Sequence, residues 1–348
     1  MKIFNNLYGL IISQENLLYS WDRFKKGKRC KKGVALFEYY LEQNLFDLHR
    51  VLKDKSYRHK PYFGFYISDP KVRHIHKATV RDRVVHHALF KMLNPLFEPT
   101  FIHDSFSCRL GKGNYVGMKR LEVMARKVSE NYTHPCFVLK CDIKKFFDSV
   151  DHEILLELLV KRITDPDTVW LLREIVGSFS STGTLLDKKG LPIGNLTSQL
   201  FANVYMNAFD QFMKHELRVE YYARYTDDFV VVADSTDYLE SLLSPIANFL
   251  AEHLKIELHP NKTSIRTLQS GIDFLGYIIL PHHKLLRTKT KRRIYNGLKK
   301  KVREHRKGEV SEEIIWQALQ AYLGALSHAD AYEVSEDLKN LYWYLVTD

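Results

Sequence analysis

The stretch that decides the fold runs Tyr221-Tyr-Ala-Arg-Tyr-Thr-Asp-Asp-Phe-Val-Val-Val232. Apolar segments on both sides of Thr226-Asp227-Asp228 predict a hairpin of two strands with a tight turn at its tip. Asp is a common turn residue, so a solvated turn is one interpretation. Two adjacent carboxylates also repel each other unless a cation lies between them, which makes a metal site the other interpretation.

A third carboxylate, Asp142, follows the segment Phe137-Val-Leu-Lys-Cys141, whose pattern is typical of a buried strand. Taken alone, an Asp in this place can be the N-cap of the next helix. Together with Asp227 and Asp228 it supplies three carboxylates from two strand ends. Mg²⁺ prefers such oxygen ligands and completes its shell with substrate phosphates. Two such ions about 3.5–4 Å apart clamp the attacking and leaving oxygens of a phosphoryl transfer.

The remaining pattern alternates between helices and strands. Helices are predicted through most of 1–60, from Arg83 to about Asn94-Pro95, from Asn114, and at 151–162, 166–178, 196–217, 236–254 and 289–348. Within the first of these, helical spacing is kept by Phe37, Tyr40, Leu41, Leu45, Leu48 and Leu52. Further strands are predicted at Tyr62–Ile67, before a turn at Asp69-Pro70, and in Phe274–Ile279. This order predicts an α+β fold with a sheet-based palm and appended subdomains.

Composition and charge narrow the class of protein. The chain has 348 residues, 45% hydrophobic and 27% charged, as in ordinary globular proteins. Its net charge is +11, with Lys and Arg concentrated in residues 25–32 and 289–307. A solvated basic surface would explain the charge, but its clustering favours binding of a polyanion, because neutralised phosphates release counterions.

Neither a membrane protein nor a zinc protein is indicated. The chain lacks a run of about 18 uncharged apolar residues, and Met1 to Ser20 lacks a signal-peptide core. We therefore expect a cytoplasmic protein without a membrane partner. The cysteines Cys30, Cys108, Cys136 and Cys141 form no CxxC pair, which argues against a zinc site and for reduced thiols.

Residues 66–280 resemble a reverse transcriptase, motif after motif and in order. The matching segments are Arg73 to Val85, Phe106–Gly113, Asp142–Phe147, Ile193–Gln199, Tyr225–Asp228, Pro260–Lys262 and Phe274–Tyr277. The resemblance implies a right-hand polymerase fold with fingers, an antiparallel-sheet palm and a short helical thumb. It also implies an RNA-directed DNA polymerase that uses two Mg²⁺ ions, with Mn²⁺ able to substitute.

The resemblance carries roles over to particular residues. It implies metal ligands at Asp142, Ile143, Asp227 and Asp228, and Lys262 as the general acid toward pyrophosphate. It implies that the incoming nucleotide contacts Arg73, Arg109, Lys112, Phe147, Ile193, Gly194 and Gln199, with Phe147 excluding a ribose 2′-OH. It implies contact with primer–template by Phe274, Leu275, Gly276 and Tyr277 of the primer grip and by Lys291, Arg292 and Lys299 of a basic thumb helix. That helix could also be only a solvated face.

One departure from the family pattern narrows the resemblance. Most reverse transcriptases carry Gln-Gly-x-x-x-Ser-Pro near the nascent base pair, whereas this chain has Ile193 for the Gln and Gln199 for the Pro. This variant resembles the enzymes of diversity-generating retroelements, which are related to group II intron enzymes. The resemblance implies a template RNA copied into cDNA with errors opposite adenine, and a small, basic, oligomeric accessory protein. An apolar pocket discriminates weakly between ligands, so Ile193 could lower fidelity, or it could be only a packing residue.

The predicted division of the chain is fingers with an N-terminal helical extension at 1–135, palm at 136–280 and thumb at 281–348. Residues 186–205 are expected to return to the nascent base pair. No RNase H, endonuclease or zinc-finger domain is expected after the thumb. The expected partners are template RNA, an RNA/DNA primer–template and dNTPs.

Two other functions remain open. One is a different bacterial reverse transcriptase, defence-associated or like those of group II introns. The other is a non-catalytic RNA-binding scaffold, which the intact Asp142, Asp227 and Asp228 disfavour.

Several weaker features have structural interpretations that we prefer. His86-His87 is expected in a helix, at its surface or in the core, without a metal. Asp151 is expected to cap the helix that follows it, and Asp234 to be structural rather than a third ligand of the hairpin. Aromatic residues before the first turn could stack on bases but more often form sheet core; these are Tyr57, Tyr62, Phe63, Phe65 and Tyr66.

Overall fold

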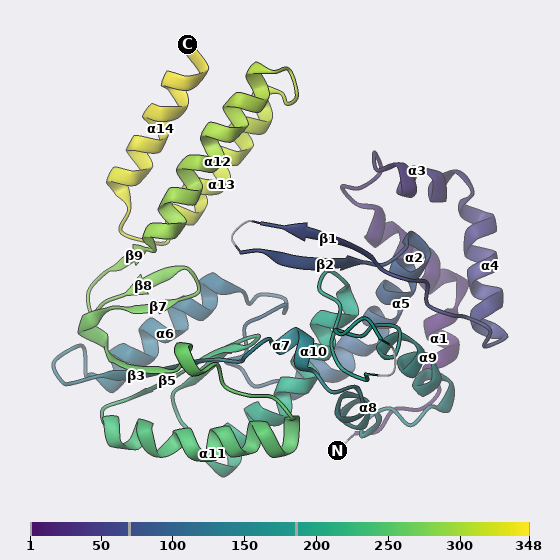
Figure 1. The fold of residues 1–348 in the computed structure, drawn as a ribbon, viewed down its shortest axis with the longest axis horizontal. Helices are drawn as coiled ribbons and strands as arrows, with labels where there is room; N and C mark the ends of the chain where they lie inside the picture. Colours follow the sequence, from purple (N-terminus) through teal and green to yellow (C-terminus); the bar gives the residue numbers. More distant parts are fainter. Residues whose placement is uncertain (1, 69–70, 185–186, 348) are drawn as a thin grey trace.

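The computed structural model describes residues 2–68, 71–184 and 187–347 and shows an α+β protein (Figure 1). Its N-terminal part consists of α1 (Tyr8–Ile12), α2 (Gln14–Lys25), α3 (Lys32–Tyr39), α4 (Leu41–Lys53) and α5 (Val80–Phe97). Helices α2 and α5 pack against each other through buried apolar side chains such as Trp21, Phe24 and Leu89. The side-chain amide of Asn16 joins them further, because it donates to the backbone oxygen of Ala88 at 3.2 Å. The prediction of an N-terminal helical part is therefore confirmed.

Two helix boundaries differ from the sequence prediction. The apolar spacing from Phe37 to Leu52 is interrupted at Tyr40, where α3 ends and α4 begins. The helix predicted to end near Asn94-Pro95 continues to Phe97. Pro95 stands in the last turn of α5, where it removes one backbone hydrogen bond without ending the helix.

Strands β1 (Phe63–Ile67) and β2 (Arg73–Lys77) form a two-stranded antiparallel sheet, here called the aromatic hairpin. Figure 1 shows it extending from the N-terminal helices in the direction of the C-terminal ones. Phe63 is 69% and Tyr66 70% exposed, and all five residues of β1 are exposed. The prediction that these aromatics form sheet core is therefore wrong for β1, although Tyr57 is buried. The predicted turn at Asp69-Pro70 lies outside the described residues.

A four-stranded antiparallel sheet, here called the central sheet, has the strand order β4-β5-β3-β6. Its strands are β3 (Phe137–Asp142), β4 (Tyr222–Tyr225), β5 (Asp228–Ala233) and β6 (Ser264–Thr267). The predicted hairpin of β4 and β5 is confirmed, and so is the buried strand that ends at Asp142. In this order β3 and β5 are neighbours, although the residues between them in the chain form several helices.

The two faces of the central sheet pack into two separate hydrophobic cores, because alternate side chains of its strands point to opposite faces. Leu139 and Cys141 of β3 belong to one core, together with buried residues of α10 (Leu196–Gln211) and α11 (Thr236–Leu254). Val138 of β3 belongs to the other, together with α6 (Asn114–Val128) and the C-terminal helices. Successive side chains of a strand point to opposite faces, so this split is the expected consequence of the apolar sequence of β3.

Shorter elements connect the helical and sheet parts. They are η1 (Glu98–Thr100), α7 (Phe146–Ser149), α8 (His152–Val160), α9 (Pro166–Val176), the π-helical turn η2 (Phe212–Glu216), η3 (Pro260–Lys262) and η4 (Leu268–Ser270). The predicted N-cap is confirmed, because the Asp151 carboxylate accepts from the backbone N–H groups of Glu153 and Ile154. His86 lies in α5, is buried, and contacts the Thr197 hydroxyl through Nδ1 at 2.6 Å.

The C-terminal part begins with a three-stranded antiparallel sheet of β7 (Ile272–Phe274), β8 (Tyr277–Ile279) and β9 (Lys284–Leu286). The C-terminal helices follow as α12 (Thr288–Arg306), α13 (Glu312–Leu326) and α14 (Tyr332–Thr347). The strand pair at 274–279 and the helical end are thus confirmed, whereas β9 was not predicted. Across the described ranges, the model contains no helix with the length and hydropathy needed to cross a membrane.

Candidate active site

Asp142, Asp227 and Asp228 meet at one end of the central sheet. The register pairs Asp142, the last residue of β3, with Asp228, the first residue of β5. The backbone N–H of Ile143 donates to the backbone oxygen of Asp227 at 3.2 Å. Strand pairing therefore brings the three residues that the sequence predicted to act together to the same end of the sheet.

Two lysines approach these carboxylates, Lys262 from η3 and Lys140 from β3. Nζ of Lys262 lies 2.7 Å from Oδ1 of Asp142. Nζ of Lys140 lies 3.8 Å from Oδ1 of Asp228 and donates to the backbone oxygen of Asp273 at 2.6 Å. Lys140 was missed in the sequence, although it stands two residues before Asp142 and so on the same face of β3.

Burial and neighbouring negative charges both raise the pKa of Asp227 and the pKa of Asp228. Burial raises the pKa of Asp227 to about 6, and the charges of Asp142 and Asp228 add to the rise while Lys262 opposes it. Burial likewise raises the pKa of Asp228, with Lys140 opposing and Asp142 adding. A bound cation would favour the ionised forms of both carboxylates.

The carboxylate oxygens of Asp142, Asp227 and Asp228 are suitable ligands for a divalent cation, but their present arrangement does not surround one. Among the residues that the structure describes, no three His, Cys, Asp or Glu side chains converge closely enough to hold a metal ion together. Oδ1 of Asp228, however, is buried and accepts no hydrogen bond. Carboxylate oxygens are the hard donors that Mg²⁺ prefers, and substrate phosphates complete its shell. Ile143 could contribute only its backbone oxygen, because its side chain is apolar and buried.

The aromatic hairpin docks beside α10 through the loop that the sequence predicted to approach the nascent base pair. The backbone N–H of His76 donates to the oxygen of Ile193 at 3.0 Å, and the Asn195 amide donates to the oxygen of His76 at 3.0 Å. Gly194 has φ +113°, and a Cβ there would lie 2.9 Å from the side chain of Ile75. Gly194 is thus required by backbone conformation and by close approach of β2. Ile193 is half-buried.

The remaining residues predicted around the nucleotide lie on three elements. Gln199 is exposed on the first turns of α10. Phe147 is half-buried in α7, and its backbone oxygen accepts from the N–H of Leu191 at 2.6 Å. Arg73 is exposed at the start of β2, and its charge opposes the rise that burial gives to the pKa of Tyr225. The arginine therefore acts electrostatically on the residue that begins Tyr225–Asp228.

Arg109 and Lys112 are turned toward their own loop. The Arg109 side chain is only 7% exposed, and its guanidinium donates to Glu98 Oε1 and to the backbone oxygens of Ile102 and Ser105 at 2.7–2.8 Å. Nζ of Lys112 donates to the backbone oxygen of His103 at 2.9 Å. In this structure Arg109 therefore holds a loop together and is not presented at the surface.

The predicted primer grip is a tight turn between β7 and β8. Leu275 has φ +51° and Gly276 φ +97°, as a two-residue hairpin turn requires. Phe274 and Tyr277 are buried, and the Tyr277 hydroxyl donates to the backbone oxygen of Ala325 at 3.0 Å. Only the turn itself, with Leu275 and Gly276, is therefore accessible for contact with nucleic acid.

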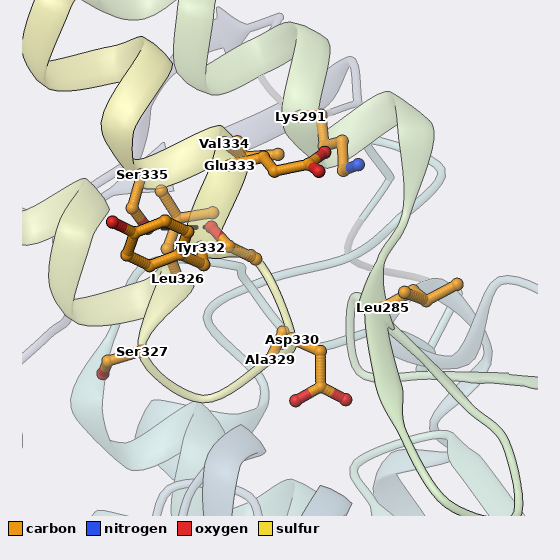
Figure 2. Close-up of a pocket in the computed structure, with 11 residues that line it drawn as sticks. Leu285, Lys291, Leu326, Ser327, Ala329, Asp330, Tyr332, Glu333, Val334 and Ser335 are labelled. Carbon is orange, nitrogen blue, oxygen red and sulfur yellow. Dashed lines mark hydrogen bonds between the residues drawn. The ribbon is translucent and has the colours of Figure 1, made fainter.

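The predicted basic thumb helix is α12, whose apolar face is buried and whose basic residues lie mostly outside. Arg292 and Lys299 are exposed and Lys291 is half-buried. Lys291 also lines a cavity of about 740 Å³ between β9 and the turn that joins α13 to α14 (Figure 2). None of the three carboxylates lines this cavity, so it is separate from the candidate active site.

Comparison with known proteins agrees with this geometry. Residues 60–279 match the family described as reverse transcriptase (RNA-dependent DNA polymerase). Protein YkfC of Escherichia coli (strain K12) is 25% identical over 283 residues, which cover 70% of this chain and 72% of YkfC. The group II intron-encoded protein LtrA of Lactococcus lactis subsp. cremoris is 22% identical over 352 residues, which cover 80% of this chain and 57% of LtrA. The chain thus spans little more than half the length of LtrA.

A solved structure of apo telomerase from Candida tropicalis, truncated from the C-terminal domain, covers 71% of this chain and 60% of its own. Its sequence identity is 11% and its TM-score 0.49.

The family match spans more than half of the chain and contains Asp142, Asp227, Asp228 and Lys262. The predicted α+β fold with antiparallel sheets is confirmed. The chain belongs to the reverse transcriptase family of RNA-dependent DNA polymerases.

Proposed function

We propose that this polymerase copies a template RNA into cDNA by nucleotidyl transfer at Asp142, Asp227 and Asp228. The observation that carries the proposal is the register that sets Asp142 opposite Asp228 at the end of the central sheet. Two Mg²⁺ ions, or Mn²⁺ in their place, would be held by these carboxylates with the backbone oxygen of Ile143. When bound, the ions supply charge stabilisation to the attacking and leaving oxygens.

The proposed roles of the protein's own groups follow from their positions. Lys262 lies beside Asp142 and would donate a proton to the leaving pyrophosphate. Arg73 and Lys112 would attract the triphosphate, and Arg109 would support them by fixing its loop. Phe147, which is half-buried beside Leu191, would fill the space that a ribose 2′-OH needs.

The proposed path of nucleic acid uses three surfaces. Arg292 and Lys299 on α12 would contact phosphates of the primer–template, with Lys291 beside them. The turn at Leu275-Gly276 would support the primer end. The exposed aromatics of β1 are suited to stacking on unpaired template bases. Accordingly, we assign fingers to residues 1–135, palm to 136–280 and thumb to 281–348.

A finer proposal is that the enzyme serves a diversity-generating retroelement in the cytoplasm and makes errors opposite template adenines. Its support is Ile193 and Gln199, the departures from the common reverse transcriptase pattern. The loop that carries Ile193 is hydrogen-bonded to β2, which holds it next to the aromatic hairpin. The same proposal includes structured template RNA and a small basic accessory protein as partners.

The test of catalysis is primer extension by Asp227→Asn, with Asp234→Asn as the matched control. Asp234 is exposed one residue beyond β5, so its replacement should leave activity unchanged. Asp227→Asn should abolish nucleotide addition and leave RNA binding largely intact. An unmutated chain that binds RNA but adds no nucleotide under any metal condition would instead indicate a non-catalytic scaffold.

The test of biological role is sequencing of the RNA that copurifies with the protein. A template that matches a repeat in a nearby variable gene would support the retroelement. An intron RNA or an unrelated structured RNA would point to a group II intron-like or defence-associated enzyme.

The accessory partner is tested by activity on that RNA. The isolated chain should polymerise poorly on its native template and gain strongly when the basic protein encoded beside it is added. Full activity of the isolated chain would remove the partner from the proposal.

A further inference from the structure

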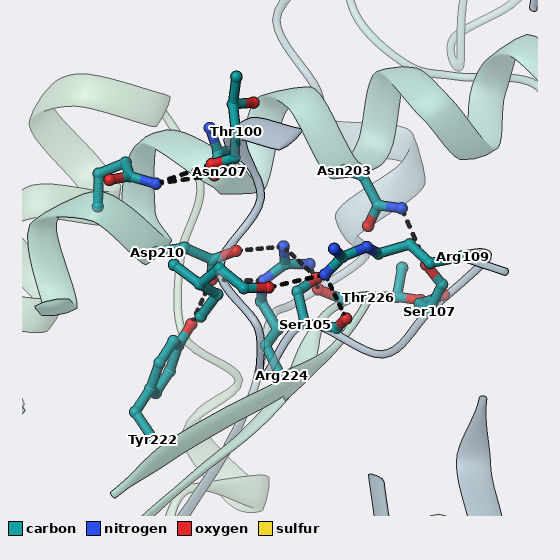
Figure 3. A network of polar contacts seen from close by, with 12 residues as sticks. Thr100, Ser105, Ser107, Arg109, Asn203, Asn207, Asp210, Tyr222, Arg224 and Thr226 are labelled. Carbon is teal, nitrogen blue, oxygen red and sulfur yellow. Dashed lines mark hydrogen bonds and ion pairs between the residues drawn. The ribbon is translucent and has the colours of Figure 1, made fainter. Parts of the chain in front are cut away.

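Arg224 of β4 is a charged side chain with no solvent exposure (Figure 3). Its Nε and Nη2 atoms donate to the two carboxylate oxygens of Asp210, on α10, at 2.7 and 2.6 Å. Nη2 also lies 3.1 Å from the Ser105 hydroxyl. The Tyr222 hydroxyl donates to Asp210 as well, at 2.8 Å. Such a pair gives little net stability, because both charges lose their water, so its position calls for another reason.

A further contact of Arg224 reaches the turn that carries the catalytic carboxylates. Nη1 donates to the backbone oxygen of Thr226 at 3.0 Å. That oxygen belongs to the peptide that joins Thr226 to Asp227. Thr226 has φ +58°, a left-handed conformation that a β-branched residue rarely adopts without support. Arg224 therefore holds the peptide plane from which Asp227 projects.

The loop after η1 supports the same turn from a second side. The hydroxyl of Thr226 donates to that of Ser107 at 2.6 Å. The backbone oxygen of Ser107 accepts from the Asn203 amide, on α10, at 2.9 Å. The loop is bonded to β4 through the backbone of Arg224, which accepts from the N–H of Phe106 and donates to the oxygen of Asp104, each at 2.9 Å. The turn is thus enclosed between α10 and this loop.

We propose that Arg224 is a positioning residue for nucleotidyl transfer, which sets the direction of Asp227 by fixing the strained Thr226 peptide. Asp210 anchors the guanidinium, and Ser107 fixes the threonine hydroxyl. The inference rests on the proposed catalytic role of Asp227. It adds that the buried ion pair serves the geometry of the reaction rather than the stability of the fold.

The test must avoid leaving one buried charge alone, because that would unfold the protein for an unrelated reason. The triple variant Arg224→Met, Asp210→Leu, Tyr222→Phe removes all the polar groups of the pair at similar volume. Tyr222→Phe alone is the matched control, because it loses a bond to Asp210 and leaves the contact with Thr226 intact. Arg224→Lys is a second variant, because it keeps the charge but lacks the planar fork that reaches Asp210, Ser105 and Thr226 at the same time.

We expect the triple variant to fold, as a single cooperative unfolding transition would show. Its RNA affinity and its KM for dNTP should stay near those of the parent. Its kcat should fall on the order of tenfold or more, because small misplacements of reacting groups have effects of that size. Its half-saturating Mg²⁺ concentration should rise, which a purely structural role would not cause. Arg224→Lys should show the same two changes, and Tyr222→Phe neither.

Parent values of kcat and of the Mg²⁺ dependence in either folded variant would overturn the inference. If the triple variant does not fold, Arg224→Lys decides, and if neither folds, the claim that the pair serves geometry rather than stability is refuted. Asp227→Asn is assayed in parallel. Activity in that variant would refute the proposed function itself, whereas an inactive Asp227→Asn beside a fully active triple variant would refute only the role of Arg224.

Discussion

Lys262 reaches Asp142 from a separate segment of the chain, with Nζ 2.7 Å from Oδ1. The backbone N–H of His259 donates to the backbone oxygen of Asp142, also at 2.7 Å, and so ties η3 to the end of β3. Because this bond lies in the backbone, replacing the lysine side chain should leave the segment in place.

Lys262→Met should therefore slow chemistry without displacing η3. If the lysine donates the proton to pyrophosphate, kcat should fall by roughly 10²-fold or more while the dNTP KM changes little. Single-nucleotide incorporation under single-turnover conditions measures this directly. Lys161→Met, at an exposed lysine after α8, is the control and should behave as the parent. A loss confined to KM would assign Lys262 to binding only.

Asp227 should make the metal-free protein less stable as pH rises. Its carboxyl binds a proton more tightly in the folded chain, with a pKa raised from 3.8 to about 6. The unfolding free energy should therefore fall between about pH 4 and pH 6, by at most about 3 kcal/mol. Without Mg²⁺ at pH 7, Asp227→Asn should melt at a higher temperature than the parent. Mg²⁺ should raise the Tm of the parent more than that of the variant. Equal pH profiles for the two proteins would contradict the raised pKa.

Phe147→Ala should admit ribonucleotides. The ring is half-buried in α7, and its removal opens space without breaking the backbone bond from Leu191. The measurement is the ratio of kcat/KM for a dNTP and the matching rNTP. Asp148→Ala, at the exposed neighbouring residue, should keep the parent's ratio. Unchanged exclusion of ribonucleotides in Phe147→Ala would place the sugar check elsewhere.

Ile193→Gln should lower misincorporation opposite template adenine with elongation roughly preserved. One added hydrogen bond is worth about 0.5–1.5 kcal/mol, or several-fold in error rate. The backbone bond from His76 to residue 193 does not depend on the side chain, so the loop should stay docked. Sequencing of cDNA made on one defined RNA gives the error spectrum. Ile193→Leu, which remains apolar, should keep the parent's errors. If both variants match the parent, Ile193 is a packing residue.

Phe63→Ser should weaken binding of unpaired template. Stacking of a base on an aromatic ring contributes about 1–3 kcal/mol, and the ring is 69% exposed. The affinity should drop for a primer–template with a single-stranded template overhang and stay constant for a blunt duplex. Tyr39→Ser, at a 79% exposed aromatic at the end of α3, serves as the control. Equal losses on both substrates would argue against template stacking.

The sequence predicted β3 and the hairpin of β4 and β5 well, because β3 and β5 are mostly apolar and carboxylates stand at the ends of these strands. Arg224 and Lys140 could not be assigned in the same way. A charged residue in a strand is ordinarily expected to face solvent, whereas Arg224 is buried by a partner on α10 that lies 14 residues earlier in the chain. Only tertiary packing brings that pair together.

The aromatic hairpin shows the opposite limit of sequence reasoning. Phe63 and Tyr66 are residue types that usually form a sheet core. Their sequence pattern does not reveal that β1 pairs only with β2, in a sheet that leaves them exposed. Arg109 was carried over from a motif, and its motif is present, but its guanidinium turns inward to Glu98. Local pattern identified these segments, and their surroundings decided the direction of each side chain.

The register between β3 and β5 makes the enzyme unequally tolerant of length changes. Strand pairing, and not any connecting loop, sets Asp142 opposite Asp228. Insertions in exposed connections far from these strands should leave the spacing of the carboxylates untouched. Deletion of one residue inside β3 would turn every side chain on one side of the gap to the opposite face of the sheet. A single lost codon there would place an apolar neighbour of Asp142 opposite Asp228.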